Sequence, residues 1–243
     1  MPEGPSILIL KETLKPFEGK KVIAVEGNAK IDLKRIKGKK IIELQSWGKQ
    51  LFICFNGFFL RIHLLMFGSY RINEKKDTAP RLNLTFVRGE INFYNCSIKL
   101  LEGAPGDLYD MESDVLSDLW NAAKAEKKLK ALKKENVCDT LLNQEIFSGV
   151  GNIIKNEVLF LLKIHPKSVT GKLPAKKLKA LIKLARDYSW DFYHWKKAFE
   201  LRKHWQIYFK SECPRCKIHS KKEYLGKGNR LTFYCDNCQE LYK

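Results

Sequence analysis

The sequence predicts a multi-domain α+β protein: an N-terminal helix with an antiparallel β-sandwich, then a helical domain, then a small C-terminal finger. Three observations support this prediction. Short apolar runs separated by turn residues occupy roughly residues 20 to 101, apolar residues at helical spacing dominate the region after residue 110, and two CxxC pairs lie near the C-terminus.

The first region is expected to begin with a helix and continue with strands. Pro5 suits the first turn of a helix, and the apolar residues after it give one buried face as far as Gly19. Asn56-Gly57 and Arg88-Gly89-Glu90 are hairpin signals between strand-like runs. These runs are Val22–Val25, Ile41–Leu44, Leu51–Phe55, Phe58–Ile62, Leu82–Val87 and Ile91–Tyr94. Short strands with frequent turns are typical of an antiparallel sandwich.

The second region is expected to be helical. Glu102–Asp110 contains Gly and Pro and suits a linker. Helical patterns then cover Val115–Leu132, Thr140–Phe147, Asn152–Leu162 and Pro174–Phe199. We therefore predict a helix and sandwich over residues 1–101, a linker over 102–110, a helical domain over 111–204 and a finger over 205–243.

The charge balance points to a polyanionic partner. The chain has 45 Lys and Arg against 27 Asp and Glu, a formal net charge of +18. Nucleic acid is the expected partner because neutralised phosphates release counterions, and a generally Lys-rich composition is the alternative. No apolar run approaches the roughly 20 residues that span a bilayer, and the N-terminus does not resemble a signal sequence. We expect an intracellular protein of the cytoplasm or nucleoid, not secreted and without a membrane partner.

The cysteines fall into two classes. Cys54, Cys96 and Cys138 lie in apolar surroundings and are expected to be buried thiols, not a disulfide framework. The other four form two CxxC pairs separated by eighteen residues, a spacing that gives a closed tetrahedral site for one structural Zn²⁺. A closed site leaves no position for water, so a metalloenzyme using this ion is disfavoured. The predicted ligands are Cys213, Cys216, Cys235 and Cys238.

Two further segments suggest nucleic-acid chemistry or binding. Glu223–Leu225 and Leu231–Tyr234 predict a two-stranded ribbon whose tip presents Lys227 and Arg230 outward. In the segment ending Gly149-Val150-Gly151-Asn152, the glycines permit a sharp turn after which Asn152 caps the next helix. Free N–H groups at that helix start would bind phosphate, and an ordinary helix–turn–helix corner is the alternative.

The N-terminus is a candidate nucleophile. If Met1 is removed, Pro2 presents a secondary amine with a pKa near roughly 8. Attack of this amine on sugar C1′ displaces a base and leaves a cationic iminium, which acidifies the C2′ proton and promotes strand cleavage. Glu3 is placed to shuttle protons at the deoxyribose ring oxygen. On these residues alone, a disordered chain start is the favoured alternative.

Taken together, these signals resemble the formamidopyrimidine-DNA glycosylase and endonuclease VIII family of base-excision repair enzymes. The resemblance covers nearly the whole chain in order, through Pro2-Glu3-Gly4-Pro5, Gly48-Lys49, Leu141–Asn152 and the ribbon with Arg230. It implies a β-sandwich, a helix–two-turn–helix domain that binds DNA, and a zinc finger. The expected partner is double-stranded DNA with a damaged base or an abasic site, bound by a monomer.

The family's functional residues can be matched to positions in this chain. Pro2 matches the Schiff-base nucleophile and Glu3 the catalytic acid. Lys49 matches a lysine at the lesion that contacts phosphate and serves as proton donor in β-elimination, although alone it would be taken for a surface lysine. Asn152 matches an asparagine that grips phosphate, and Arg230 a finger-tip arginine linked to δ-elimination.

The family also fills the gap that a flipped nucleotide leaves in the base stack. In His63–Gly68, the residues that match this void-filling loop are Leu65, Met66 and Phe67. An equally weighted alternative is a strand end that feeds the core.

Three departures bear on the branch of the family. Ser6 stands where many members carry a second glutamate, and Asn92–Ser97 lacks the arginines typical of the purine-directed branch. The chain leading into Cys213 is also too compact for a long base-capping loop. These features resemble the endonuclease VIII branch, which prefers oxidised pyrimidines; oxidised purines such as 8-oxoguanine are the alternative substrate class.

The expected function is therefore a bifunctional DNA glycosylase and apurinic/apyrimidinic lyase that acts through a Schiff base of Pro2, followed by β- or β,δ-elimination. The alternative is a non-catalytic damaged-DNA-binding protein that keeps the finger and the helical clamp. A binding module needs neither Pro2 nor Glu3, so the enzyme is favoured.

Overall fold

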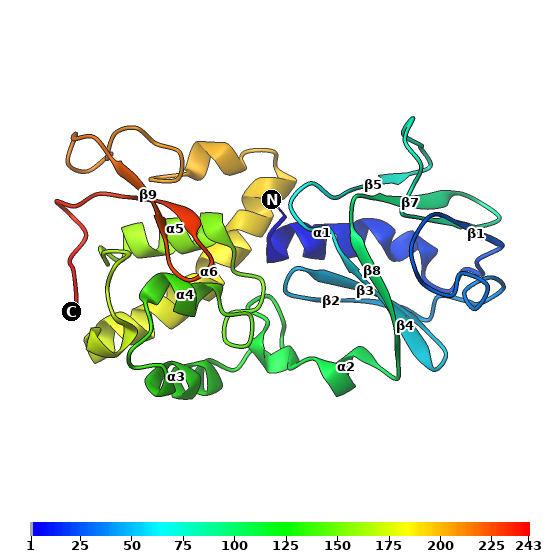
Figure 1. Cartoon of the computed structure of the whole chain (residues 1–243), viewed down its shortest axis with the longest axis horizontal. Coiled ribbons are helices and arrows are strands. Elements are labelled where there is room, and N and C mark those ends of the chain that lie inside the picture. The colour runs from blue at the N-terminus through cyan, green and yellow to red at the C-terminus, as the bar shows by residue number, and fades with distance from the viewer. Residues whose placement is uncertain (1) are drawn as a thin grey trace. The chain divides into compact units, whose positions relative to one another are not determined.

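A computed structural model describes residues 2–243, which form two compact units, Met1–Tyr109 and Asp110–Lys243 (Figure 1). Each unit has its own core. The predicted finger belongs to the same compact unit as the helices. Within residues 2–243, no helix is both long and apolar enough to cross a membrane.

The first unit is a β-sandwich with one long helix, α1 (Gly4–Leu14), extended by the 3₁₀ turn Lys15–Phe17. One antiparallel sheet has the strand order β1-β6-β7-β5 and the other the order β2-β3-β4-β8. The strands are β1 (Ala24–Glu26), β2 (Glu43–Trp47), β3 (Gln50–Phe55), β4 (Phe58–His63), β5 (Ser69–Ile72), β6 (Leu82–Thr85), β7 (Glu90–Tyr94) and β8 (Ser97–Glu102). The fold class predicted for this region is confirmed.

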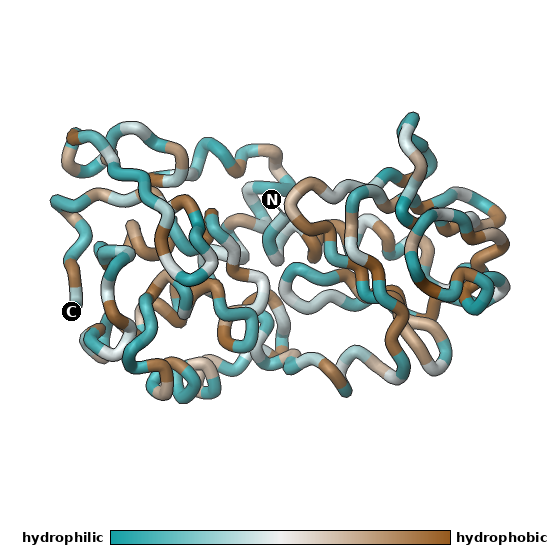
Figure 2. Tube along the Cα trace, viewed as in Figure 1, coloured by the Kyte–Doolittle hydropathy of each residue, from teal (hydrophilic) through white to brown (hydrophobic). Residues whose placement is uncertain are grey.

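The alternation of side chains along β3 explains why this strand lies at the centre of the sandwich. Leu51, Ile53 and Phe55 point into the core shared with α1 and the other sheet. Phe52 points to the opposite face, where its ring lies 4.8 Å from that of Tyr109. Figure 2 shows the resulting concentration of hydrophobic residues along these strands. Both faces of this strand are therefore buried.

The second unit contains the helices and the finger. Its helices are α3 (Ala122–Ala131), α4 (Val137–Leu142), α5 (Asn152–Leu161) and α6 (Ala175–Lys197), with short 3₁₀ turns at Met111–Ser113, Thr170–Lys172 and Leu201–His204. The four-residue helix α2 (Pro105–Leu108) lies at the end of the first unit. Helix α6 packs against α3 and α5. The ribbon strands β9 (Lys221–Leu225) and β10 (Arg230–Tyr234) are antiparallel, and β10 packs on α5.

The structure differs from the sequence prediction at several elements. Strands β5 and β8 were not predicted, and the predicted linker contains the end of β8 together with helix α2. Helix α3 begins at Ala122, seven residues later than the helical pattern suggested, because Asn121 caps it by accepting a hydrogen bond from the backbone N–H of Lys124 at 3.0 Å.

Candidate active site

The N-terminal residues lead directly into α1. Pro2 precedes the helix, and Glu3 occupies its N-cap position without using its side chain as a cap. Pro5 lies in the first turn, where its fixed φ suits a helix start. The backbone N–H of Ser6 donates to the carbonyl of Glu3 at 2.8 Å, which fixes the backbone of Glu3 relative to the helix.

Glu3 is almost completely buried, with 1% of its surface exposed. Burying a carboxylate is unfavourable unless other groups stabilise it, so a buried glutamate at a chain start is an informative exception to the usual exposure of acidic residues. The structure therefore places a carboxylate next to Pro2 in surroundings largely shielded from water. Met1 lies outside the described residues, and its removal stays a prediction.

Lys49 lies in the two-residue turn between β2 and β3. Trp47 pairs with Gln50 across this turn, and Gly48 adopts φ +54° at the position where a type II′ turn requires glycine. Lys49 is half-buried. Its charge contributes, after burial and the charge of Arg61, to lowering the pKa of His63 on β4. Lys49 is thus held by a defined turn on a sheet edge, near other cationic groups.

The segment between β4 and β5 exposes three consecutive apolar side chains. Leu64 is buried, while Leu65, Met66 and Phe67 are exposed, Phe67 by 80%. The backbone N–H of Gly68 donates to the carbonyl of Leu64 at 2.7 Å, and a Cβ at position 68 would lie 1.9 Å from that oxygen. Only glycine permits this tight turn. The side chain that feeds the core is therefore Leu64, and the next three point away from it.

The turn before α5 differs in detail from the sequence prediction. Gly151 is the N-cap, and Asn152 is the first residue of the helix and does not cap it. The Asn152 side chain donates instead, from Nδ2 to the carbonyl of Leu231 in β10 at 2.8 Å. Its Oδ1 is buried and accepts no hydrogen bond from the described residues. The expectation that Asn152 caps α5 was wrong, because glycine without a side chain already occupies that position.

Three consecutive polar residues of α5 anchor the finger, and sequence analysis missed them. Lys155, Asn156 and Glu157 are fully buried. Lys155 Nζ donates to Thr232 Oγ1, and Asn156 Oδ1 accepts from the N–H of Phe233, both at 2.7 Å. Together with Asn152, these side chains hold three successive residues of β10. A run of Lys, Asn and Glu inside an apolar helix was the available signal.

Glu157 fixes the chain that enters the finger. Its carboxylate accepts hydrogen bonds from the backbone N–H groups of Gln206, Ile207 and Tyr208 at 2.8, 3.0 and 2.7 Å. Burial raises the pKa of Glu157, and the three donors act in the opposite direction by stabilising the charged form. A single buried side chain thus orders the segment just ahead of the first CxxC pair.

The finger tip is attached to the start of α4. Arg230 begins β10 and is half-buried. The side chain of Asp139 accepts a 2.8 Å hydrogen bond from the backbone N–H of Lys227, and Lys227 Nζ forms an ion pair with Glu135 at 2.7 Å. Lys227 does point outward, as predicted, but its charge is already paired within the protein. Arg230 is the predicted cation at the tip that forms no ion pair with another residue in the described range 2–243.

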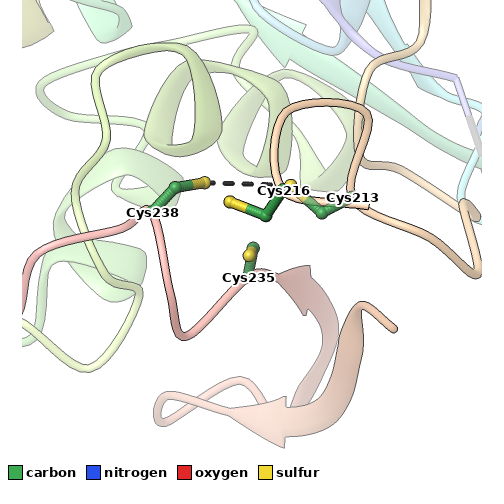
Figure 3. Close-up of side chains that lie close together, drawn as sticks. All are labelled: Cys213, Cys216, Cys235 and Cys238. Carbon is green, nitrogen blue, oxygen red and sulfur yellow. Dashed lines mark hydrogen bonds between the residues drawn. The ribbon is translucent and has the colours of Figure 1, made fainter. Parts of the chain in front are cut away.

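The four predicted zinc ligands converge, as Figure 3 shows. Their sulfur atoms all lie within 4.8 Å of one another, and the Sγ atoms of Cys213 and Cys238 are 3.8 Å apart. Thiolates at roughly 2.3 Å from a tetrahedral ion would be about 3.8 Å from one another, so the cluster fits one metal ion. The amide of Asn237 donates to the sulfur of Cys216 at 3.3 Å, an interaction that orients this ligand.

The remaining three cysteines are buried, as predicted. Burial raises the pKa of the Cys54 thiol to about 12 and those of Cys96 and Cys138 to about 11. These thiols therefore stay protonated at neutral pH and act as small apolar side chains.

Comparisons with known proteins agree with this arrangement. The family model of the formamidopyrimidine-DNA glycosylase N-terminal domain matches residues 1–97, and the model of the formamidopyrimidine-DNA glycosylase H2TH domain matches residues 111–188. Among curated relatives, endonuclease 8-like 3 of Xenopus laevis is 31% identical over 90% of this chain and 38% of its own length. Endonuclease 8-like 2 of Bos taurus is 38% identical over 74% of this chain and 58% of its own length. The chain thus spans between a third and three fifths of the length of these relatives.

Solved structures show the same fold. Lactococcus lactis formamidopyrimidine-DNA glycosylase, non-covalently bound to DNA containing an abasic site, superposes with a TM-score of 0.85 at 23% identity, covering 98% of this chain and 99% of that one. A viral DNA glycosylase superposes with a TM-score of 0.84 at 20% identity, covering 98% and 100% of the two chains. The two matched domain models, the curated relatives and the cysteine cluster lead to one conclusion: the chain belongs to the formamidopyrimidine-DNA glycosylase and endonuclease VIII family, on its endonuclease VIII-like branch.

Proposed function

We propose that this protein is a bifunctional DNA glycosylase and apurinic/apyrimidinic lyase of base-excision repair. The observation that carries the proposal is the buried carboxylate of Glu3 next to Pro2 at the start of α1. A protein that only bound DNA would gain nothing from burying a glutamate there, whereas acid–base catalysis at a sugar needs a carboxylate protected from water.

The chemistry follows from the amine of Pro2 after removal of Met1. The nitrogen lone pair forms a bond to C1′ of the damaged nucleotide while the bond from C1′ to the base breaks, and the departing base takes up a proton. Glu3 protonates the ring oxygen as the sugar opens. The resulting iminium nitrogen carries four bonds and a fixed positive charge, so it withdraws electrons and acidifies the C2′ proton.

Removal of that C2′ proton drives β-elimination. The electron pair of the C2′–H bond forms a C2′–C3′ double bond, and the 3′ phosphate leaves with its oxygen. Lys49 supplies or accepts protons in this step, and Arg230 favours the subsequent loss of the 5′ phosphate by δ-elimination. Water then hydrolyses the iminium, which releases the sugar fragment and regenerates the amine of Pro2.

Asn152 and Arg230 grip the phosphates around the extruded nucleotide. Support comes from the hydrogen bonds of α5, which bind β10 immediately after Arg230. The exposed turn with Leu65, Met66 and Phe67 fills the gap in the base stack, and its exposure supports this role. The partner is double-stranded DNA with a damaged base or an abasic site, bound by a monomer within the cell.

One structural Zn²⁺ held by Cys213, Cys216, Cys235 and Cys238 completes the finger. The substrate class we propose is oxidised pyrimidines, supported by the endonuclease 8-like relatives, which are more than 30% identical to this chain. Gel-resolved cleavage of duplexes that each carry one oxidised pyrimidine or one 8-oxoguanine tests this preference.

Borohydride trapping tests the mechanism. Borohydride reduces an iminium to a stable amine, so wild-type protein with Met1 removed should become covalently attached to DNA that holds an oxidised pyrimidine. Pro2→Gly should form less adduct, and protein with a retained N-terminal extension should form none because its amine is blocked. Binding without any adduct from a mature N-terminus would instead identify a non-catalytic damaged-DNA-binding protein.

A further inference from the structure

The C-terminal end of α6 carries a phenylalanine where helices normally place glycine. After Lys197 the helix ends in a Schellman motif: the N–H of Glu200 donates to the carbonyl of Trp195 at 2.8 Å, and that of Phe199 to the carbonyl of Lys196 at 3.1 Å. Phe199, between them, adopts φ +60°. Glycine is favoured at this position because a Cβ strains the left-handed conformation.

The side chain of Phe199 gains nothing within the protein to offset this strain. It is 96% exposed, the highest exposure of any large hydrophobic residue that the structure describes. Phe209 has a similar backbone, φ +58°, but its ring packs 4.8 Å from the rings of both Tyr208 and Phe233. Phe199 combines a strained backbone with an unburied ring, and residues held at such a cost cluster at functional sites.

The surroundings of Phe199 are rigid and basic. The ring of Trp195, before Phe199, stacks on that of His204, after it, with centroids 4.2 Å apart and an interplanar angle of 4°. This contact links the chain on the two sides of the turn. Lys196 and Lys197 precede Phe199 in the last turn of α6, and Arg202 follows it; all three are exposed. The nearby acid, Glu200, forms an ion pair with Lys203 at 2.7 Å. The net charge around the ring is therefore positive.

We infer that Phe199 is a base-stacking residue that binds an unpaired nucleobase, with the phosphates on either side bound by Lys196 and Arg202. This inference rests on the proposed function and adds a nucleic-acid contact to it. An aromatic ring among cations fits single-stranded nucleic acid, because a base offers a π-face and its backbone offers negative charge. A protein partner would favour an apolar patch around the ring, and this ring has lysine and arginine neighbours instead.

Phe199→Gly tests the inference directly, because glycine removes both the backbone strain at φ +60° and the exposed aromatic ring. The variant should unfold at an equal or higher temperature than wild type, since glycine suits the Schellman position. It should bind a short oligodeoxythymidylate about 5- to 150-fold more weakly, the range expected for loss of one aromatic–base stack. Phe199→Tyr should bind nearly as wild type, and Phe199→Leu as weakly as Phe199→Gly, because leucine is apolar but cannot stack. Fluorescence anisotropy measures all four affinities.

The salt dependence separates stacking from charge. Phe199→Gly should leave the slope of log K against log salt concentration unchanged, while Arg202→Ala should reduce it by about one. A 2-aminopurine base in the oligonucleotide should be quenched by wild-type protein and by Phe199→Tyr, but much less by Phe199→Gly.

Wild-type affinity and quenching in Phe199→Gly would overturn the inference, and Phe199→Leu binding as tightly as wild type would replace stacking by a generic apolar contact. A lower unfolding temperature of Phe199→Gly would assign Phe199 a structural role instead. Borohydride trapping of the wild type, measured in parallel, shows separately whether the proposed glycosylase activity holds, because the binding readouts do not require it.

Discussion

Asn152 and Leu231 lie 79 residues apart in the chain and are joined by a 2.8 Å hydrogen bond from the side-chain amide to the main-chain carbonyl. One turn further along α5, the side-chain oxygen of Asn156 accepts a hydrogen bond from the main-chain N–H of Phe233 at 2.7 Å. Two asparagine side chains four residues apart on α5 thus form hydrogen bonds to alternate residues, Leu231 and Phe233, of strand β10. The phosphate-binding candidates Asn152 and Arg230 are positioned by the same set of contacts.

We expect Asn156→Ala to weaken lesion cleavage although we assign this side chain no contact with DNA. The substitution leaves the buried N–H of Phe233 without its acceptor, which should lower the free energy of unfolding by about 1–3 kcal/mol. Urea denaturation measures the loss, and cleavage assays at rising DNA concentration show whether the variant has a raised KM. Asn28, an exposed asparagine in the other unit, provides the control: Asn28→Ala should change stability and cleavage much less. Full stability and activity in Asn156→Ala would show that β10 does not depend on this bond.

Glu3→Gln should separate base removal from sugar chemistry. The amide cannot donate a proton to the ring oxygen, so excision of an oxidised pyrimidine should slow by roughly 10²- to 10⁴-fold. An abasic sugar exists partly as the open aldehyde, which Pro2 attacks without that proton, so borohydride trapping on abasic DNA should persist. Single-turnover kinetics on both substrates measure the difference. An equal loss on both would mean that Glu3 serves chiefly to position the N-terminus.

Arg230→Ala should reduce lesion cutting by about tenfold or more, because a charge-assisted hydrogen bond to phosphate contributes roughly 1.5–3 kcal/mol. Lys227→Ala, in the same turn, is the control and should have a smaller effect, because Lys227 is already paired with Glu135. Metal content, measured in both variants, should equal that of wild type. Equal activity losses in Arg230→Ala and Lys227→Ala would show that the positive charge of the finger tip matters, and not a specific contact of Arg230 with phosphate.

Removal of the metal should unfold the finger and leave the helices folded. The small core of this region contains two of the cysteines, Cys213 and Cys235, together with Phe160, Ile207 and Phe233, so it cannot persist once the thiolates lose their ion. After dialysis against a chelator, circular dichroism should retain the helical signal while DNA affinity falls, and added Zn²⁺ should restore binding. Metal-free protein that binds DNA normally would make the finger dispensable.

The unfolding free energy should decrease in mildly acidic solution through His63. Its pKa is lowered by burial and then by the charges of Arg61 and Lys49. Between that lowered value and the usual value of about 6.5, the unfolded chain binds a proton that the folded chain does not, so stability falls as the pH drops below about 6.5. His63→Gln should flatten this dependence. Urea titrations at several pH values measure it, and identical curves for both proteins would contradict the assignment.

The sequence predicted structure best where the residue types themselves determine the outcome, as in metal binding by cysteine pairs and burial of a continuous apolar run. The CxxC spacing identified all four cysteines of the cluster, and the continuous apolar run Leu51–Phe55 identified a buried strand. Strand β5, with the sequence Ser-Tyr-Arg-Ile, lacks an apolar run and depends on pairing with β7, so local patterns could not reveal it. Lys155, Asn156 and Glu157 are of residue types that are usually exposed on a helix. Their burial depends on β10 and on residues 206–208, which lie far along the chain.

The hydrogen bonds of α5 also bear on how this protein can be recombined with its relatives. A chimera that exchanged only residues 205–243 would set Asn156 and Glu157 against a foreign main chain, with buried polar atoms left unmatched. The smallest transplantable module is therefore the finger together with α5, even though more than forty residues separate these two segments in the sequence. Grafts designed on linear domain boundaries would separate the side chains of α5 from their hydrogen-bond partners in the finger.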